Sequence, residues 1–393
     1  YNQRITLCEG IEVRFTDVGH LLGSACIEIW INEDGVSKKI VFSGDVGNLN
    51  QPIIKDPQCV KETEYVVIES TYGDRTHGDK IPDYVGEFTR ILKETFDRGG
   101  NVVIPSFAVG RTQEILYFIR EIKEENRIPE YPDFEVYVDS PLAIEATRVF
   151  NKNVKSCFDE DAMKLIEQGI NPLVFPGLKT SITSDDSKEI NFDEKPKVII
   201  SASGMCDAGR IRHHLKHNLW RKECTICFVG YQAVGTLGRK LVEGAECVKI
   251  FGESIMVNAK IECLQGISGH ADMNGLLAWL HGFEKKPERI MVVHGEDHVT
   301  DSFAELASKE IGCPAFAPYS GGCVDLATNT VITAVPKKAA EKPARARANA
   351  AFERVVAAAK RLLQVVLKNE GLANKDLAKF ETQIQNLADK WDR

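Results

Sequence analysis

Five polar residues that could hold a metal ion each follow a short apolar run in this chain. The runs occupy positions 13–25, 39–45, 65–73, 266–272 and 289–296, and they deliver His20, Asp45, Glu69, His270 and His294. An apolar run of this length, bounded by Gly and Ser, predicts a buried strand with a polar tail where the chain leaves the sheet. Sites in α/β sheets form at the carboxyl edge of the strands, so the five side chains are expected to converge. Imidazoles and carboxylates are the ligands expected for zinc or a similar ion.

The spacing of these residues predicts an interrupted domain. The first three occur within the first 70 residues, whereas His270 and His294 come some 200 residues later. If all five belong to one site, the segment between Glu69 and His270 is an inserted domain.

The inserted segment has the pattern of a parallel α/β domain. Strands are expected at 101–105, 134–138, 197–201 and 225–229, separated by helices near 82–97, from Gly110, over 207–218 and from about Thr236. Strands separated by helices of this length indicate a parallel sheet with right-handed crossovers. Residues 266–335 are then expected to return to the first domain in the order strand, helix, strand, helix.

Several ordered motifs carry a resemblance to a known family. They are GHLLGSA, SGD and ESTYGDRTH, then PSFAVGRTQEIL, DSPLA, SASGMCDAGR and GYQAVGTLGR, and finally SGHAD and VVHGE. From about Ile11 to about Leu326 the chain resembles the β-CASP branch of the metallo-β-lactamase-fold nucleases, which includes ribonuclease J and the endonuclease subunit of the pre-mRNA 3′-end cleavage machinery. The resemblance implies an α/β fold, a metallo-β-lactamase αββα sandwich with an inserted α/β β-CASP domain, followed here by a helical C-terminal tail. The corresponding ranges are 1–73, 74–265, 266–336 and 337–393.

The resemblance also implies roles for the five residues. It assigns His20 to one Zn²⁺, Asp45 to a position that bridges two Zn²⁺ ions, and His294 to the second ion, with Mn²⁺ as the alternative metal. Glu69 and His270 become a proton-transferring pair beside the metals, and His77 is a weaker candidate for the same neighbourhood. The implied reaction is hydrolysis of RNA phosphodiester bonds, with Asp45, Glu69 and His270 as the catalytic set.

One family motif is absent from the 393 residues. Such proteins carry a His-x-His-x-Asp-His cluster near their start, which supplies most metal ligands, and this sequence has none. Two zinc ions with about four ligands each need more donors than His20, Asp45 and His294 provide. We therefore expect the amino-terminal part of the sandwich to be missing, a companion amino-terminal fragment or longer chain to supply the cluster, and this chain alone to be a poor metal binder and inactive.

Three Gly-rich turns in the inserted segment are candidates for binding an RNA backbone, because helix starts bind anions. In 201–210, Asp207 is expected to cap a helix over 208–218 and to leave the amides of Ser203 and Gly204 facing an anion. The turns 108–114 and 235–239 each place an arginine in the first helical turn. The predicted phosphate-binding residues are Ser201, Ser203, Gly204, Arg111, Arg210, Gly235, Thr236 and Arg239, with Arg212, His213 and Lys216 adding charge to the same rim.

Other polar residues in this segment have simpler explanations. His213 and His217 are four residues apart on a predicted helix, but no acidic partner accompanies them, and contact with solvent or phosphate is the better interpretation. Cys224 and Cys227 form a CxxC within an apolar strand without a second pair, which predicts core thiols.

Composition agrees with a globular protein of the cytoplasm. Charged residues make up 27% of the chain, the net charge is -8, and no apolar run approaches the roughly 18 residues of a membrane span. Eleven cysteines, many in apolar segments, indicate free thiols in a reducing compartment. The acidic balance argues weakly against nucleic acid, although a nuclease needs only a local basic cleft.

The last 57 residues differ from the rest. Positions 337–361 hold eight Lys and Arg against two Glu, and two amphipathic helices are expected, separated near Gly371. The first carries an apolar stripe through Phe352, Val355, Leu362, Leu363 and Val366, and the second continues from Leu377 to Trp391. The hairpin either packs on its own chain or mediates homodimer formation.

Three functions remain open at this point: a zinc-dependent ribonuclease, a noncatalytic RNA-binding or scaffold subunit of a processing complex, and a small-molecule hydrolase. The long insertion argues against a small substrate. The five intact family positions argue against a scaffold.

Overall fold

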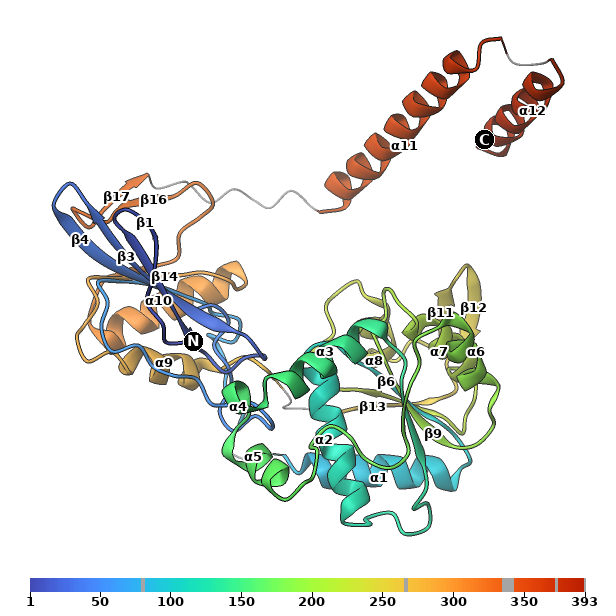
Figure 1. The fold of residues 1–393 in the computed structure, drawn as a ribbon, viewed down its shortest axis with the longest axis horizontal. Coiled ribbons are helices and arrows are strands. Elements are labelled where there is room, and N and C mark those ends of the chain that lie inside the picture. The colour runs from blue at the N-terminus through green and yellow to red at the C-terminus, as the bar shows by residue number, and fades with distance from the viewer. Residues whose placement is uncertain (79–81, 265–267, 334–342, 372–373, 392–393) are drawn as a thin grey trace. The chain divides into compact units, whose positions relative to one another are not determined.

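The computed structural model describes residues 1–78, 82–264, 268–333, 343–371 and 374–391. The chain divides into two compact units, Tyr1–Ala334 and Val335–Arg393. The first unit is built on two large sheets, each with its own helices (Figure 1).

A seven-stranded sheet draws its strands from both ends of the first unit. In spatial order they are β1 (Ile5–Cys8), β2 (Ile11–Asp17), β3 (Ala25–Glu33), β4 (Val36–Phe42), β5 (Tyr65–Ile68), β14 (Arg289–Val292) and β15 (Ala315–Phe316). The first four strands are antiparallel neighbours, whereas β4, β5, β14 and β15 run parallel. The pairing of β5 with β14 confirms that segments on both sides of the insertion share one sheet.

The intervening residues form a six-stranded, wholly parallel sheet, as the alternation of strands and helices predicts. Its spatial order is β13 (Lys260–Cys263), β10 (Thr225–Phe228), β6 (Val102–Pro105), β9 (Lys197–Ser201), β7 (Glu135–Val138) and β8 (Leu178–Thr180). Every residue of β6, β9 and β10 is buried, which explains why these strands are continuous apolar runs.

Helices cover both faces of the six-stranded sheet. One core joins its strands to α1 (Tyr84–Asp97), α2 (Arg111–Glu124), α3 (Pro141–Lys152) and α5 (Glu160–Glu167). The other core joins them to α6 (Ser184–Phe192), α7 (Ile211–Asn218), α8 (Leu237–Val242) and the hairpin of β11 (Cys247–Ile250) and β12 (Glu253–Met256). The predicted core thiols Cys224 and Cys227 are fully buried.

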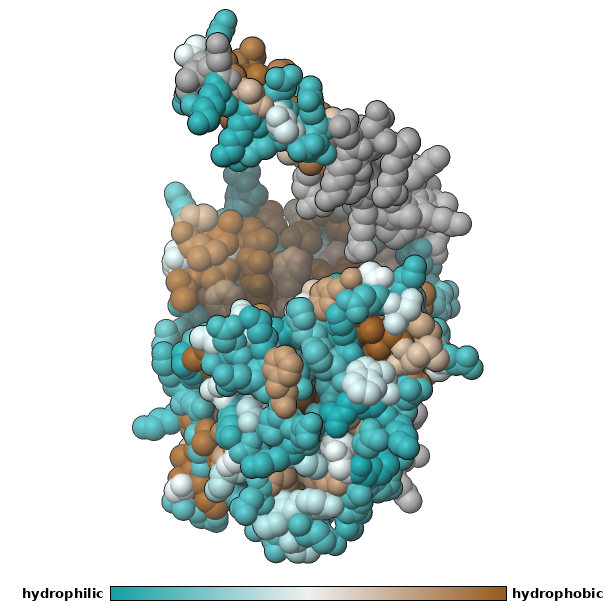
Figure 2. Space-filling model, turned by 90° about the vertical axis from the view of Figure 1, so that its right-hand side faces the viewer, coloured by the Kyte–Doolittle hydropathy of each residue, from teal (hydrophilic) through white to brown (hydrophobic). Residues whose placement is uncertain are grey.

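The two faces of the seven-stranded sheet differ. On one face Val41, Val66 and Ile290 pack against α9 (Met273–His281) and α10 (Asp297–Ile311). On the other, the small cluster around Ile40 and Met291 includes Val324 of β16 (Cys323–Asp325), and β16 pairs with β17 (Thr330–Thr333). Further along this second face, apolar side chains are exposed, namely Ile5, Leu7, Phe15 and Phe42. Figure 2 shows hydrophobic side chains gathered in the more distant part of the view, behind the largely hydrophilic six-stranded lobe.

Two predicted elements need correction. Residues 268–272 are not a strand, because Ser268 and Gly269 form a turn in which the His270 amide donates to Ser268 Oγ, and His270 makes only an isolated bridge to Gly47. The return segment is therefore α9, β14 and α10, followed by three short strands, rather than strand, helix, strand, helix. Helix α7 begins at Ile211 and not near Asp207, whose carboxylate accepts from the Leu237 amide at the start of α8 instead.

The second unit contains the two predicted helices, α11 (Pro343–Lys368) and α12 (Asn374–Trp391), with Gly371 between them in a left-handed conformation. Within the described part of the α11 stripe, Val355 and Leu363 are exposed. The predicted basic residues at 337, 338 and 342 and the side chains of Phe352 and Trp391 lie outside the described residues. Among the helices that the structure describes, none combines the length and apolar character needed to cross a membrane.

Candidate metal centre

The carboxyl edge of the seven-stranded sheet brings three predicted metal ligands together. His20 follows β2, Asp45 follows β4 and His294 follows β14. Asp45 lies between the two imidazoles: His20 Nε2 is 3.8 Å from Asp45 Oδ2, and His294 Nε2 is 3.6 Å from Asp45 Oδ1. These strands run in the same direction, so the polar tails of segments far apart in sequence meet at one edge.

The predicted pair of Glu69 and His270 is formed beside them. His270 Nδ1 lies 3.1 Å from each carboxylate oxygen of Glu69. The His20 and His270 rings have centroids 4.3 Å apart. Among the described residues, His20, Asp45 and His270 offer ligand atoms that all lie within 4.8 Å of one another. All five predicted residues therefore belong to one cluster, although His270 reaches it from a turn rather than from a strand.

Backbone donors fix the Glu69 carboxylate. The Val46 amide donates to Oε1 at 2.6 Å and the Thr71 amide donates to Oε2 at 3.2 Å. Burial opposes ionisation of Glu69, but the hydrogen bond with His270 and the Thr71 donors leave its pKa lowered. Burial likewise opposes the charged form of His270, yet Glu69 and Asp45 leave the pKa of this imidazole raised. The pair is thus held as a carboxylate that orients a basic imidazole.

The pKa of His20 is shifted in the opposite direction from that of His270. Burial and the neighbouring His270 lower the pKa of His20, which favours its neutral form. Metal ions bind neutral imidazole and ionised carboxylate, so His20 and Asp45 have the donor chemistry that zinc requires. The described donors fit a metal centre, but they are fewer than two four-coordinate ions need.

Two glycines allow the loops at this edge to approach closely. A Cβ at Gly47, which bridges to His270, would lie 2.0 Å from the Gly19 carbonyl oxygen beside His20. A Cβ at Gly295, next to His294, would lie 2.6 Å from Ser70 Oγ. Any larger residue would separate the loops that carry the ligands.

His77, the weaker candidate, supports the backbone of the cluster. Its Nε2 lies 3.0 Å from the His270 carbonyl oxygen, and its amide donates to Asp272 Oδ2 at 2.9 Å. Asp272 also caps α9 by accepting from the Gly275 amide. His77 thereby links the start of the inserted segment to the turn that presents His270.

The first predicted phosphate turn is partly engaged within the protein. The Ser203 amide donates to the Ala208 carbonyl, so of the two expected amides only that of Gly204 has no acceptor among the described residues. Ser201 is buried, and its hydroxyl donates to the Asp139 carbonyl at 2.8 Å.

Arg210 has a long-range partner that its local sequence does not reveal. Its Nη1 donates to Asp139 Oδ1 at 2.7 Å, and its Nη2 donates to the Ile182 carbonyl at 2.8 Å. Asp139 also accepts from Ser187 and contacts His214, and it is fully buried. Much of the positive charge of Arg210 is therefore balanced inside the protein.

The other two turns keep the predicted arrangement of strand, turn and helix. Thr236 caps α8 by accepting from the Arg239 amide, and Gly235 has a φ of 90°. Arg239 pairs with Glu243 at 2.7 Å, and Arg111 pairs with Glu114 at the start of α2.

A cavity of about 580 Å³ joins the edge that carries His20 and His270 to the turn 108–114 and to Met205 of the turn 201–210. Its lining includes His20, His270 and Arg111, together with the aromatic residues Tyr72, Phe107 and Tyr231. Phe107 and Tyr231 are about half exposed. The three aromatic residues lie within sequence motifs quoted above, but nothing in their local pattern assigned them a role.

Comparison with known proteins agrees with this geometry. A family model described as the Beta-Casp domain matches residues 112–241, and one described as the Zn-dependent metallo-hydrolase RNA specificity domain matches residues 254–318. The chain is 37% identical over 287 residues to a ribonuclease of Thermus thermophilus, covering 73% of this chain and 63% of that protein.

Two archaeal relatives extend the comparison. An RNase J-like protein of Methanocaldococcus jannaschii is 33% identical over 325 residues, 82% of this chain and 72% of that protein. The transcription termination factor FttA of the same organism is 30% identical over 319 residues, 79% of this chain but 49% of that factor. The chain thus spans between about half and three quarters of the length of these relatives.

The fold is an α/β sheet domain with an inserted parallel α/β domain. The chain belongs to the β-CASP family of metallo-β-lactamase-fold, metal-dependent ribonucleases.

Proposed function

We propose that this protein hydrolyses phosphodiester bonds of single-stranded RNA with two metal ions, zinc or manganese, held at the carboxyl edge of the seven-stranded sheet. The observation that carries the proposal is the placement of Asp45 between His20 and His294, next to the Glu69–His270 pair. Family membership and the matched RNA specificity domain support RNA as the substrate.

The residues divide into metal ligands and a proton-transfer pair. His20 would hold one ion, His294 the other, and Asp45 both. When bound, the ions would supply Lewis-acid stabilisation of the phosphate charge and a nucleophile at neutral pH. Glu69 holds the His270 ring through Nδ1, which leaves Nε2 to protonate the departing 3′ oxygen.

We further propose that additional ligands come from an amino-terminal segment that contains the His-x-His-x-Asp-His cluster, carried on the same polypeptide or on a companion fragment. The ligand count supports this, because the three assigned residues cannot satisfy two four-coordinate ions. The exposed apolar face of the seven-stranded sheet, including Phe15 and Phe42, supports a covering segment as well.

The exposed α11 stripe supports self-association as a further proposal. Val355 and Leu363 of the stripe are 65% and 59% exposed, and the neighbouring Leu367 is 65% exposed, which is unusual for apolar residues on one helix. Leu363→Asp should convert a dimer to a monomer in sedimentation velocity, whereas Lys360→Asp, at an exposed lysine of the same helix, should not. A wild-type protein that sediments as a monomer would contradict this proposal.

Digestion of a labelled RNA oligonucleotide tests the proposed reaction. The form of the protein that includes the amino-terminal cluster should cleave single-stranded RNA, lose activity on exhaustive chelation, and regain it with Zn²⁺ or Mn²⁺. Activity that survives chelation would rule out the metal mechanism.

A further inference from the structure

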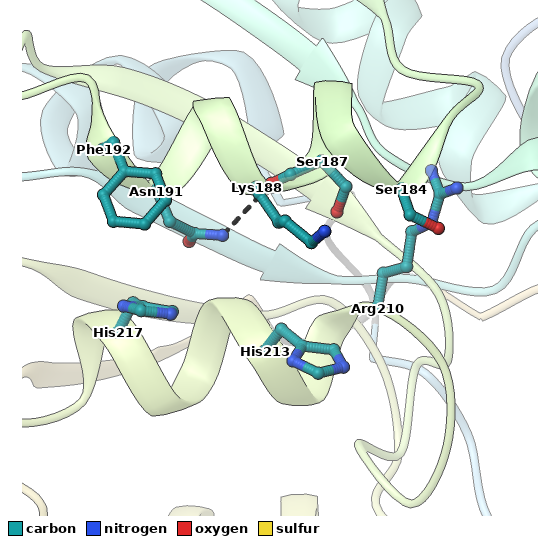
Figure 3. Close-up of a pocket in the computed structure, with 8 residues that line it drawn as sticks. All are labelled: Ser184, Ser187, Lys188, Asn191, Phe192, Arg210, His213 and His217. Carbon is teal, nitrogen blue, oxygen red and sulfur yellow. Dashed lines mark hydrogen bonds between the residues drawn. The ribbon is translucent and has the colours of Figure 1, made fainter.

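A groove between α6 and α7 lies outside the metal centre and has no part in the proposed reaction. Its cavity measures about 210 Å³. Figure 3 shows the side chains of the two helices facing each other across it. We call it the α6–α7 groove, and its lining residues are Ser184, Ser187, Lys188, Asn191, Phe192, Arg210, His213 and His217.

The lining has the chemistry of a surface that binds nucleobases. Phe192 is 76% exposed, and its ring centroid lies 6.4 Å from that of His217 across the groove. His213 lies with its ring 4.5 Å from that of Phe251, another exposed aromatic residue. Single-stranded nucleic acids stack their bases on exposed aromatic rings of this kind.

The two histidines are suited to hydrogen bonds with base edges. Partial burial and the neighbouring His214 lower the pKa of both His213 and His217. A neutral imidazole has one donor and one acceptor nitrogen, as the edges of nucleobases do. The Asn191 amide on the opposite wall is already bonded to His214 and to the Ser187 carbonyl, so the two histidines are the groups available to a base.

The lining of the groove carries no carboxylate that would repel an anionic ligand. None of its eight lining residues is acidic, and Lys188 projects into it (Figure 3). The opposite side of α6 is different, because Asp186 and Glu189 line a separate cavity together with Asp193. Helix α6 thus presents carboxylates on one side and cationic or neutral groups on the side that faces α7.

The groove is continuous with the first predicted phosphate turn. Arg210 is both the last residue of that turn and one end of the groove, and His217 and Phe192 mark the other end (Figure 3). From Arg210 to His217 the helix rises about 10 Å. That length matches about three stacked nucleotides at a rise of about 3.4 Å each.

We infer that the α6–α7 groove is a second binding site for single-stranded RNA, which holds the part of a strand that extends past the metal centre. The inference rests on the proposed function for the identity of the ligand. It adds a prediction of its own. The affinity of the protein for RNA should still increase when the RNA is longer than the segment that the metal centre can hold. This increase should depend on the residues of the α6–α7 groove.

Photocrosslinking tests the location of the RNA without requiring cleavage. The chain would be irradiated, in the presence of chelator, with a length series of oligonucleotides containing 4-thiouridine, and the crosslinked peptides would be identified by mass spectrometry. Long oligonucleotides should crosslink to peptides that contain Phe192 or His217, and short ones should not. If long oligonucleotides crosslink only near Tyr72 or Phe107, the groove inference is overturned while the proposed function stands. Absence of crosslinks anywhere would overturn both.

Binding measurements with variants test the energetic contribution. Phe192→Ala should weaken binding of a long oligonucleotide by at least about fivefold, as loss of one stacked base does, and should leave binding of a short one unchanged. Phe192→Leu, which keeps an apolar side chain without a ring, should behave like Phe192→Ala.

A pair of lysines provides a matched control. Lys188 pairs with Asp185 at 2.8 Å in α6, and Lys164 pairs with Asp161 at 2.8 Å in α5, with similar exposure. Lys188→Ala should reduce the salt dependence of binding to a long oligonucleotide, and Lys164→Ala should not. Equal behaviour of the two variants, together with unchanged affinity of Phe192→Ala, would overturn RNA as the ligand and favour a protein partner.

Discussion

The carboxylate–imidazole pairs Glu69–His270 and Asp139–His214, both of which lie in the first unit, differ in what surrounds them. Glu69 and His270 lie at the edge of the seven-stranded sheet with a His270 side chain that is 21% exposed, whereas Asp139 and His214 have fully buried side chains in the six-stranded lobe. Glu69 uses only Nδ1 of His270, and Nε2 makes no hydrogen bond to a described residue. Both nitrogens of His214 are engaged, Nε2 by Asp139 and Nδ1 by Asn191.

The difference shows that the pair alone does not make a site. A histidine whose second nitrogen is open to solvent, beside other potential metal ligands, can transfer a proton. A histidine with both nitrogens bonded in a buried network can only hold the structure together. The pair at His214 joins α7 to α6 and to the end of β7, whereas His270 lines the cavity of about 580 Å³.

The largest expected effect comes from removing the His270 imidazole, whose Nε2 makes no hydrogen bond to a described residue. His270→Ala should lower the cleavage rate per folded molecule by about 10² to 10⁴, the usual contribution of a general acid. His281→Ala, at the exposed end of α9, is the control and should leave the rate unchanged. The rate of oligonucleotide cleavage by the form with the amino-terminal cluster measures both, and a His270→Ala enzyme of normal rate would show that this imidazole has no role in the chemistry.

Removing the buried His214 imidazole should affect stability instead. His214→Ala leaves the Asp139 carboxylate buried without one of its partners, which should cost about 3–5 kcal/mol in the free energy of unfolding. The folded fraction should cleave RNA at nearly the normal rate. Urea unfolding and the cleavage rate per folded molecule distinguish the two effects. A stable but inactive variant would contradict the structural role of His214.

The pH dependence of stability should report on Asp139. Burial opposes ionisation of Asp139, but the hydrogen bonds from His214 and Ser187 lower its pKa from 3.8 to about 2. Because the folded-state value lies below the unfolded one, this group stabilises the fold fully above about pH 4, and the contribution is lost as the pH falls toward 2.

The loss is on the order of 1–2 kcal/mol, and Asp139→Asn should abolish it. Urea midpoints measured at pH 5.5, 4 and 3 should therefore converge for the wild type and the variant as the pH falls. A constant difference between them would contradict the assignment.

The smallest expected effect concerns the Ser187 hydroxyl, which belongs to the buried network around Asp139. Ser187 Oγ donates to Asp139 Oδ2 at 2.6 Å, so Ser187→Ala should destabilise the protein by about 1–2 kcal/mol. Ser184 lies one helical turn earlier on α6 and makes no hydrogen bond to Asp139, so Ser184→Ala should change the free energy of unfolding by less. Equal effects would indicate that helix propensity rather than the hydrogen bond is responsible.

Much of the candidate metal centre could be predicted from the sequence because its residues directly follow strands. His20, Asp45, Glu69 and His294 each stand within three residues of a strand end, and parallel strands bring such positions together without further information. The same reasoning predicts that His270 lies near the other four but gives it the wrong local structure, since a Ser-Gly turn, not a strand, presents it.

The environment of Arg210 could not be predicted in this way. Its sequence context suggests a phosphate ligand, but Asp139, 71 residues earlier, lies within 2.7 Å of its guanidinium. His214 and Asn191 complete the network from two further elements. Contacts of this kind depend on how α6, α7 and β7 pack, and no short-range pattern reveals them.

The metal content of variants would show most directly which residues hold metal. Elemental analysis should be performed on the form of the protein that carries the amino-terminal cluster, comparing the wild type with His294→Ala and His270→Ala. We predict two zinc or manganese ions per chain in the wild type, a nearly unchanged content in His270→Ala, and the loss of at least one ion in His294→Ala. Equal metal loss in the two variants would contradict the separation of ligands from the proton-transfer pair, and a wild type without bound metal would contradict the metal centre itself.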